Sequence, residues 1–462
     1  MSADRGSARA TRTFLPRHPV SIVGAGLTTV TAVVFLVVFL GDLFGLHQNP
    51  YLGIVLFLVL PAFFVFGLLL IPIGRAIERR RERRGLAPAA WPRIDLNDGH
   101  QRQRAGLVVA LTAANVVILS LALYGGMEYM ETPSFCGQVC HQVMEPEFVA
   151  HQWGPHASVA CVNCHVGPGA THVAESKLAG IHRVWAVVAD GYRRPIPPPL
   201  NDLLPARDTC ERCHWPEQFH GDRLKQVHEY AEDEANTETI TTLRVHVGGG
   251  SERLGIPSGI HWHMNVANRV EFIATDPERQ VIPYVKVTLG DGTVREYLSP
   301  GVTREELAGL SPRQMDCMDC HNRPAHQVAA SAVRAVDASL ATGELPRTLP
   351  FIKREAARAL GVEYANRDAA IEGIAQTLGE FYRGPEGRAT GLDGTEVERA
   401  ISGVQAIYQR NVFPAMRVTF GTYPDNIGHI DFPGCFRCHD EEHVTSDGRA
   451  ISQDCEACHA ME

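Results

Sequence analysis

All 12 cysteines of this 462-residue chain occur in pairs, and a histidine directly follows the second cysteine of every pair. Two residues separate the cysteines in five pairs, and three separate them in the first. This pattern is typical of c-type haem attachment, in which two thiols bond to the porphyrin and the adjacent imidazole ligates the iron. The sequence predicts six covalently bound haems, with these cysteines and motif histidines: Cys136, Cys140 and His141; Cys161, Cys164 and His165; Cys210, Cys213 and His214; Cys317, Cys320 and His321; Cys435, Cys438 and His439; Cys455, Cys458 and His459.

Zinc binding and thiol redox chemistry are the other common uses of paired cysteines. A structural zinc site needs two such pairs close enough to share one ion, and a thioredoxin-like site needs a βαβ frame. Neither use explains a histidine after every second cysteine. The longer spacer between Cys136 and Cys140 can still bridge the porphyrin edge, so we expect attachment there too.

Three uncharged apolar stretches precede or lead into the first motif, at residues 20–40, 52–73 and 105–127. At about 1.5 Å per residue, each is long enough to cross a hydrocarbon layer of about 30 Å. The first is too long for a secretory signal and lacks a cleavage site. We expect three transmembrane helices that remain in the protein.

Arginines predict the orientation of these spans. Residues 41–51 contain no arginine or lysine, whereas arginines crowd the segments before the first span and between the second and third. The positive-inside rule then places the N-terminus in the cytoplasm, and three crossings deliver the chain after Glu128 to the periplasm or its equivalent. We expect an inner-membrane protein with its haems outside the cytoplasm, which is where such haems are attached. The arginines are Arg5, Arg9, Arg12 and Arg17, then Arg75, Arg79, Arg80, Arg81, Arg83, Arg84, Arg93, Arg102 and Arg104.

The rest of the chain predicts a mainly α-helical multihaem domain of low secondary-structure content with a small β insertion. Residues 171–192 have helical periodicity, with an apolar stripe typical of either a membrane-surface helix or a core helix. Strand-like sequence runs from 243 to 298, with a hairpin expected at Asp291-Gly292. Residues 325–409 predict several helices. We expect a membrane domain (1–130), a three-haem segment (131–230), a β-containing segment with the fourth haem (231–330) and a helical segment ending in a two-haem module (331–462).

Charge restricts the class of partner. Residues 105–462 carry 30 basic and 46 acidic residues, a net charge of −16. Such a surface disfavours nucleic acid and favours a basic partner such as a small periplasmic cytochrome.

Each iron needs a second axial ligand beyond the motif histidine, and histidines are abundant outside the motifs. Bis-histidine ligation is therefore expected for most haems. His443 and His326 lie too close to their own motifs to reach the opposite haem face easily, so each is expected to serve a different haem. His261 and His263 would project to one side of a strand. Met144, four residues after Cys140, is a candidate ligand of the first haem. The ranked histidines are His156, His261, His263, His326, His429 and His443.

The stretch from Ser134 to His214 resembles the NapC/NirT family of membrane-anchored quinol dehydrogenase cytochromes. The resemblance comes from a membrane helix that runs into a haem motif, Met144 just past that motif, Pro155-His156-Ala157, and Cys161-Val-Asn-Cys164-His165-Val166. It implies a first haem at the membrane face beside the quinol, with a methionine ligand and a nearby lysine and acid. Lys177 is similar in position to that lysine, and Asp190 or Glu175 could be the acid.

The wider chain is similar to the larger inner-membrane cytochromes of metal-reducing bacteria. The segments Gly259-Ile-His261-Trp-His263, Cys320-His321-Asn-Arg-Pro324 and Asn426-Ile-Gly-His429 carry this similarity. The family pattern itself has one membrane helix and four haems, whereas this chain predicts three helices and six haems.

The leading functional hypothesis is a membrane-bound quinol dehydrogenase. It takes electrons from the quinone pool, with menaquinol as the expected substrate, and passes them through its haems to a periplasmic acceptor. Quinol oxidation releases protons, so Lys177 or His182 is expected to hydrogen-bond the quinol, with an acid such as Asp190 nearby. Two alternatives remain: a terminal reductase of a small oxyanion, and a passive relay docked to another membrane complex.

Overall fold

The computed structural model describes residues 18–43, 60–85, 97–139, 141–167, 170–198, 205–215, 219–248, 259–265, 267–387 and 394–462. The chain divides into two compact units, Met1–Val139 and Cys140–Glu462. The described residues are mainly helical, with two small antiparallel sheets. This confirms the predicted fold class.

The first unit contains three helices that are long and apolar enough to cross a membrane. They are α1 (Pro19–Leu43), α3 (Leu60–Arg83) and α4 (Gly99–Met130), followed by the π-helical turn η2 (Phe135–Val139). Asp98 caps α4 by accepting a hydrogen bond from the backbone of His100. The three predicted spans are confirmed, except that the expected start of the second at Leu52 lies outside the described residues.

Small residues bring α1 and α3 together. A Cβ added at Gly24 would lie 2.6 Å from the carbonyl oxygen of Gly67, so the two backbones touch only because both positions are glycine. Ser21 Oγ donates a hydrogen bond to the carbonyl of Ile71 at 2.8 Å. Close approach through small residues, with an interhelical hydrogen bond, is typical of helix packing in membranes.

The haem motifs of the second unit begin or form short helical turns. In a helical turn, residues i, i+3 and i+4 share a face, so the two cysteines and the histidine of a CxxCH motif can point toward the same porphyrin. The elements that carry or border the motifs are one longer helix, α5 (His141–Trp153), and five short turns, α6 (Cys161–His165), α8 (Ala206–Cys210), α9 (Cys317–Cys320), η7 (Gly434–Arg437) and η8 (Cys455–Ala457).

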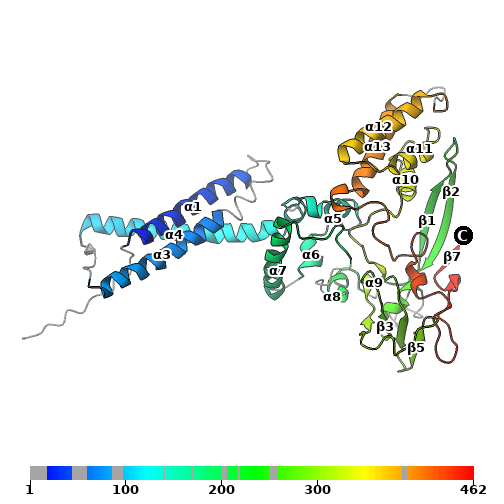
Figure 1. Ribbon diagram of the computed structural model, residues 1–462, viewed down its shortest axis with the longest axis horizontal. Helices are drawn as coiled ribbons and strands as arrows, with labels where there is room; N and C mark the ends of the chain where they lie inside the picture. The colour runs from blue at the N-terminus through cyan, green and yellow to red at the C-terminus, as the bar shows by residue number, and fades with distance from the viewer. Residues whose placement is uncertain are drawn as a thin grey trace, which may run out of the picture. The chain divides into compact units, whose positions relative to one another are not determined.

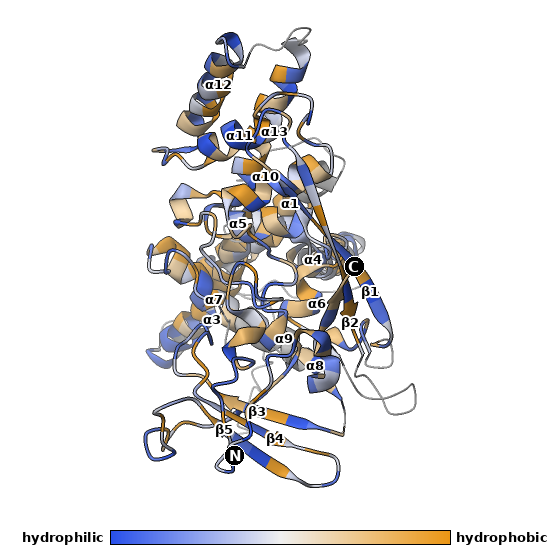
Figure 2. Cartoon of the chain, turned by 90° about the vertical axis from the view of Figure 1, so that its right-hand side faces the viewer, coloured by the Kyte–Doolittle hydropathy of each residue, from blue (hydrophilic) through white to orange (hydrophobic). Residues whose placement is uncertain are grey.

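The second unit also contains two antiparallel sheets. One has the order β1-β2-β7, with β1 (Asp222–Tyr230), β2 (Glu238–His246) and β7 (His459–Met461). The other has the order β5-β4-β3-β6, with β3 (Arg269–Ile273), β4 (Tyr284–Thr288), β5 (Val294–Leu298) and β6 (Arg313–Gln314). Strands β3, β4 and β5 mix hydrophobic and hydrophilic residues along their length (Figure 2), and they bury Val270, Phe272, Val285 and Tyr297.

The strand predictions were partly right. The hairpin at Asp291-Gly292 is confirmed, because Val285 pairs with Tyr297 and Gly292 has the positive φ of +85° that the turn requires. The prediction missed β1 and most of β2. It was wrong for His261 and His263, which lie in the 3-10 helix η5 (Ile260–Met264) and not on a strand.

Four helices between the fourth and fifth motifs form a separate hydrophobic cluster (Figure 1). They are α10 (Ala332–Ala341), α11 (Ile352–Leu360), α12 (Arg367–Arg383) and α13 (Gly394–Asn411), and they confirm the predicted helical segment. The short turn η6 (Pro414–Met416) follows. Helix α7 (Ala170–Val188) lies nearer the N-terminal motifs and confirms the helix expected at 171–192.

Candidate haem-binding sites

Five motif histidines each face a second histidine at nearly the same ring separation. The second histidine comes from a distant part of the chain in four pairs, and from 30 residues earlier in the fifth. Five of the six distal candidates ranked from the sequence take part. The pairs and their centroid distances are His165 and His326 (6.1 Å), His214 and His156 (6.0 Å), His321 and His261 (6.3 Å), His439 and His263 (5.8 Å), and His459 and His429 (6.2 Å).

This separation is the one that a shared metal ion imposes. An imidazole nitrogen binds a transition metal at about 2.0 Å, and the ring centre lies about 1 Å behind that nitrogen. Two imidazoles on opposite sides of one iron therefore have centroids about 6 Å apart. All five pairs can hold a haem iron between them.

The second ring nitrogen of several histidines is already engaged by the backbone. Nδ1 lies within hydrogen-bond distance of a carbonyl oxygen at five of them, which orients the ring and leaves Nε2 to ligate. The contacts are His156 to Pro324 (3.0 Å), His261 to Val247 (2.9 Å), His263 to Ile260 (3.0 Å), His326 to Glu147 (2.9 Å) and His439 to Ser452 (2.7 Å).

Comparison with known proteins identifies the family. The model of the NapC/NirT cytochrome c family, N-terminal region, matches residues 99–195. Cytochrome c-type protein ImcH of Geobacter sulfurreducens is 40% identical over 449 residues, which cover 96% of this chain and 88% of ImcH. The chain belongs to the NapC/NirT cytochrome c family. No solved structure matches it.

Membership confirms the resemblance seen in the sequence and has direct consequences. This NapC/NirT cytochrome is a membrane protein of electron transfer, and it binds haem covalently. Covalent haem is what the cysteine pairs predict, and the five histidine pairs fit it.

His443 is a correction to the ligands expected for this cytochrome. Its Nδ1 lies 2.9 Å from both carboxylate oxygens of Asp440, and its Nε2 lies 2.6 Å from the carbonyl oxygen of Ile282 and 2.9 Å from Ser299 Oγ. Both nitrogens are engaged and the side chain is 3% exposed, so neither is free to bind a metal. His443 instead joins the C-terminal segment to the residues just before β4 and just after β5.

His151 is a second histidine whose hydrogen bond argues against a role as a metal ligand. Its ring lies 6.2 Å from that of His326, similar to the spacing between His326 and His165. However, its Nε2 bonds to the carbonyl of Val159 at 2.9 Å. His165 is therefore the better partner of His326, and ring distance alone would not have separated the two.

Burial favours the neutral form of five of the paired imidazoles. It lowers the pKa of His165 to about 4, and it lowers the pKa of His261, His263, His321 and His326 as well. A histidine must be neutral to ligate iron, so these environments favour metal binding at neutral pH.

Consecutive motifs of the cytochrome are also neighbours in space. The thiols of Cys210 and Cys317 are hydrogen-bonded, which joins the third motif to the fourth. Burial raises the pKa of the Cys164, Cys320 and Cys458 thiols, and the charge of a thiol in a neighbouring motif raises it further. Cys213 of the third motif lies near Cys164 of the second, and Cys435 of the fifth lies near both Cys320 of the fourth and Cys458 of the sixth. The second to sixth motifs therefore follow one another in space as they do in the sequence.

The expected quinol-site residues are only partly described. The side chains of His141 and Lys177, and residue Cys140, lie outside the described part of the chain. Met144 is half-buried on α5, and His182 is exposed on α7. Asp190 follows α7, and its carboxylate accepts a hydrogen bond from the Arg194 guanidinium.

Helix α7 presents an apolar face to solvent. Ile181, Trp185 and Val188 are 67%, 68% and 73% exposed. Val187 and Tyr192 instead pack against a small core around Val143. The exposed apolar face is what a helix at a membrane surface requires.

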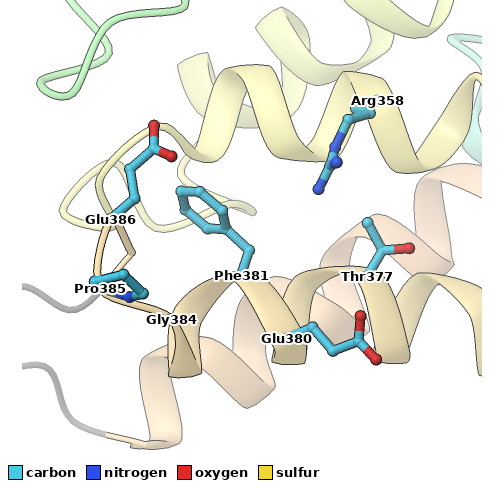
Figure 3. A pocket seen from close by; sticks show the side chains of 7 residues that line it. All are labelled: Arg358, Thr377, Glu380, Phe381, Gly384, Pro385 and Glu386. Carbon is cyan, nitrogen blue, oxygen red and sulfur yellow. The ribbon is translucent and has the colours of Figure 1, made fainter.

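A pocket on the helical cluster is unrelated to these sites. It has a volume of about 340 Å³ and lies between α11, α12 and the loop after α12 (Figure 3). Its lining contains no cysteine or histidine; the lining residues are Arg358, Thr377, Glu380, Phe381, Gly384, Pro385 and Glu386.

Proposed function

We propose that this cytochrome carries six c-type haems, oxidises quinol at the first, and passes electrons through the others in sequence order to a periplasmic acceptor. The observation that carries the proposal is the set of five histidine pairs at iron-bridging distance on consecutive neighbouring motifs. Membrane helices at one end of the chain supply access to quinol. The haems supply one-electron chemistry, and the protein holds them in order.

The proposed axial ligands follow from the ring pairs. The motif histidines of the second to sixth haems pair with His326, His156, His261, His263 and His429, in that order. His141 and Met144 are proposed for the first haem. Five filled irons leave few open coordination positions, which disfavours the terminal-reductase alternative.

Replacing a distal histidine tests this assignment. His326→Ala should convert one haem from low to high spin, visible in the optical and EPR spectra, because its iron loses one imidazole. His443→Ala is the matched control, since His443 bonds to Asp440, Ile282 and Ser299. Unchanged spin states in His326→Ala, or a high-spin haem in His443→Ala, would contradict the assignment.

Helix α7 is the proposed quinol-binding element. Its exposed apolar face suits the lipid boundary, and Lys177 and His182 lie on the same helix. Lys177 or His182 would hydrogen-bond the quinol hydroxyl as it loses its proton. Asp190, which pairs with Arg194, would hold negative charge at the end of this helix.

The acceptor is proposed to be a basic periplasmic cytochrome. Residues 425–462, which carry the fifth and sixth motifs, contain nine acidic residues and two arginines. This charge would attract a positively charged partner to the last haems of the chain.

Quinol oxidation is tested in membranes with a menaquinol analogue. Lys177→Ala should abolish haem reduction by the quinol, because the donor that orients it is lost, while dithionite still reduces all the haems. Lys225→Ala on the exposed strand β1 is the control. Unchanged reduction in Lys177→Ala would remove this lysine from the site. A wild-type protein that binds no quinone analogue would favour a passive relay.

A further inference from the structure

The five histidine pairs differ in the angle between their two rings. Two pairs are close to parallel, at 7° for His261 and His321 and 26° for His429 and His459. Two are close to perpendicular, at 75° for His156 and His214 and 90° for His263 and His439. The angle of the remaining pair, formed by the second motif, is 44°. From the third motif to the sixth, perpendicular and parallel pairs alternate.

A phenylalanine is stacked on the distal histidine of each near-parallel pair. Phe219 lies 4.3 Å from the ring of His261 at an angle of 14°, and Phe436 lies 4.2 Å from the ring of His429 at 12°. The distal histidine of a perpendicular pair has a different neighbour: Trp262 meets His263 edge-on, at 5.8 Å and 83°.

The stacked phenylalanine rings restrict the rotation of the distal imidazoles, which is the one motion that ligation leaves free. An imidazole held through Nε2 can still rotate about the metal–nitrogen bond, so its plane depends on what touches its faces and its Nδ1. At His261, the carbonyl of Val247 holds Nδ1 and Phe219 covers one face. Together these contacts fix both the direction of the ring and its plane.

Phe436 is fixed relative to His429 by the backbone around it. It lies within the fifth motif, and the amide of the adjacent Cys435 donates to the carbonyl of Gly428, next to His429, at 2.9 Å. A Cβ on Gly434 would lie 1.8 Å from that same oxygen, so only glycine allows this approach. The fifth motif thereby positions a ligand of the sixth.

We propose that Phe219 and Phe436 are positioning residues that hold the distal imidazoles His261 and His429 nearly parallel to His321 and His459. The proposal rests on the ligation proposed above. It divides the third to sixth haems into two classes that alternate along the electron path. Ring orientation changes the splitting of the iron d orbitals. In the oxidised state, parallel ligands therefore give a rhombic low-spin EPR spectrum and perpendicular ligands a much more anisotropic one.

EPR spectroscopy of the oxidised, haem-loaded protein tests this inference. Phe436→Leu keeps an apolar side chain but removes the flat face, so the rhombic signal should lose about half of its intensity to the anisotropic class. Phe219→Leu should have the same effect, and the double variant should lose nearly all of the rhombic signal. Phe436→Tyr keeps the face and should resemble the wild type. Phe381→Leu, in the helical cluster, is the matched control.

The outcomes separate this inference from the function on which it rests. Unchanged spectra in both leucine variants would overturn it, even if quinol reduction and His326→Ala behave as expected. Conversion of a haem to high spin would also overturn it, because the phenylalanine would then be needed for ligation itself. Intact-protein mass verifies that every variant retains its haems. A wild-type spectrum without low-spin bis-histidine signals would remove the ligation and this inference with it.

Discussion

The helical cluster of α10 to α13 and the haem-motif segments around it are stabilised in different ways. In the cluster, Leu340, Leu349, Ile352 and Ile374 have no exposed surface. Beside the motifs, Trp215, Ile427 and Ile430 are 46%, 44% and 57% exposed. The cluster buries its own apolar residues, whereas haem attached to the motifs would cover these exposed ones.

The comparison shows how a chain with short, irregular elements can still hold its shape. Burial of its own apolar residues is the main contribution to the stability of the cluster, as in an ordinary helical domain. The motif segments contain helical turns of three to five residues, which are too short to be stable by themselves. Covalent cofactors and their axial ligands are expected to supply the missing contacts.

Preventing haem attachment should have the largest effect, because it should destabilise the motif segments and leave the helical cluster folded. We expect the haem-free chain to lose protection from proteolysis throughout the motif segments, because their turns lack an apolar core of their own. Residues 332–411 should remain resistant. Limited proteolysis with mass spectrometry of the haem-loaded and haem-free forms measures this difference. Equal protection of both regions in the haem-free chain would show that the motif segments fold without cofactor.

A buried ion pair offers a sharper test of the cluster. Lys353 Nζ and Asp337 form an ion pair in which both side chains are largely buried, and Lys353 also donates to the carbonyl of Val333. Asp337→Ala leaves a buried lysine without its counter-charge, so it should destabilise the cluster by about 3–5 kcal/mol. Chemical denaturation followed by far-UV circular dichroism measures the loss.

The haem spectra should not change in Asp337→Ala, because the cluster is stabilised by its own core. Replacing both partners by apolar residues, Asp337→Leu with Lys353→Met, should recover most of the lost stability. A changed haem spectrum in the single variant would show that the two regions are coupled.

The smallest predicted effect concerns the start of α10. Ser331 Oγ accepts a hydrogen bond from the backbone amide of Arg334 at 3.2 Å, which caps the helix. Ser331→Ala should cost about 1 kcal/mol, while Ser331→Asp should retain the cap. Equal stability of the alanine variant and the wild type in denaturant titrations would show that this cap contributes nothing.

Much of the molecule follows from local sequence. The three membrane helices come from uninterrupted apolar length, and the helices of residues 332–411 come from periodicity. The hairpin at Asp291-Gly292 comes from turn chemistry. The strand at β1 was missed because its burial is slight and uneven, so alternation gives little signal.

The sequence by itself predicted which cysteines attach haem and which histidines remain to ligate it, because cysteine spacing and composition are local properties. Only the tertiary structure decided which histidines face each other, since the two rings of a pair can be more than 100 residues apart, as with His165 and His326. It also separated His443, whose nitrogens are both hydrogen-bonded, from His429, whose ring faces His459. The physical reason is that axial ligation requires two imidazole rings at the right distance, each with a nitrogen lone pair that is free to bind iron. The folding of the chain sets both conditions, and the spacing of histidines in the sequence does not.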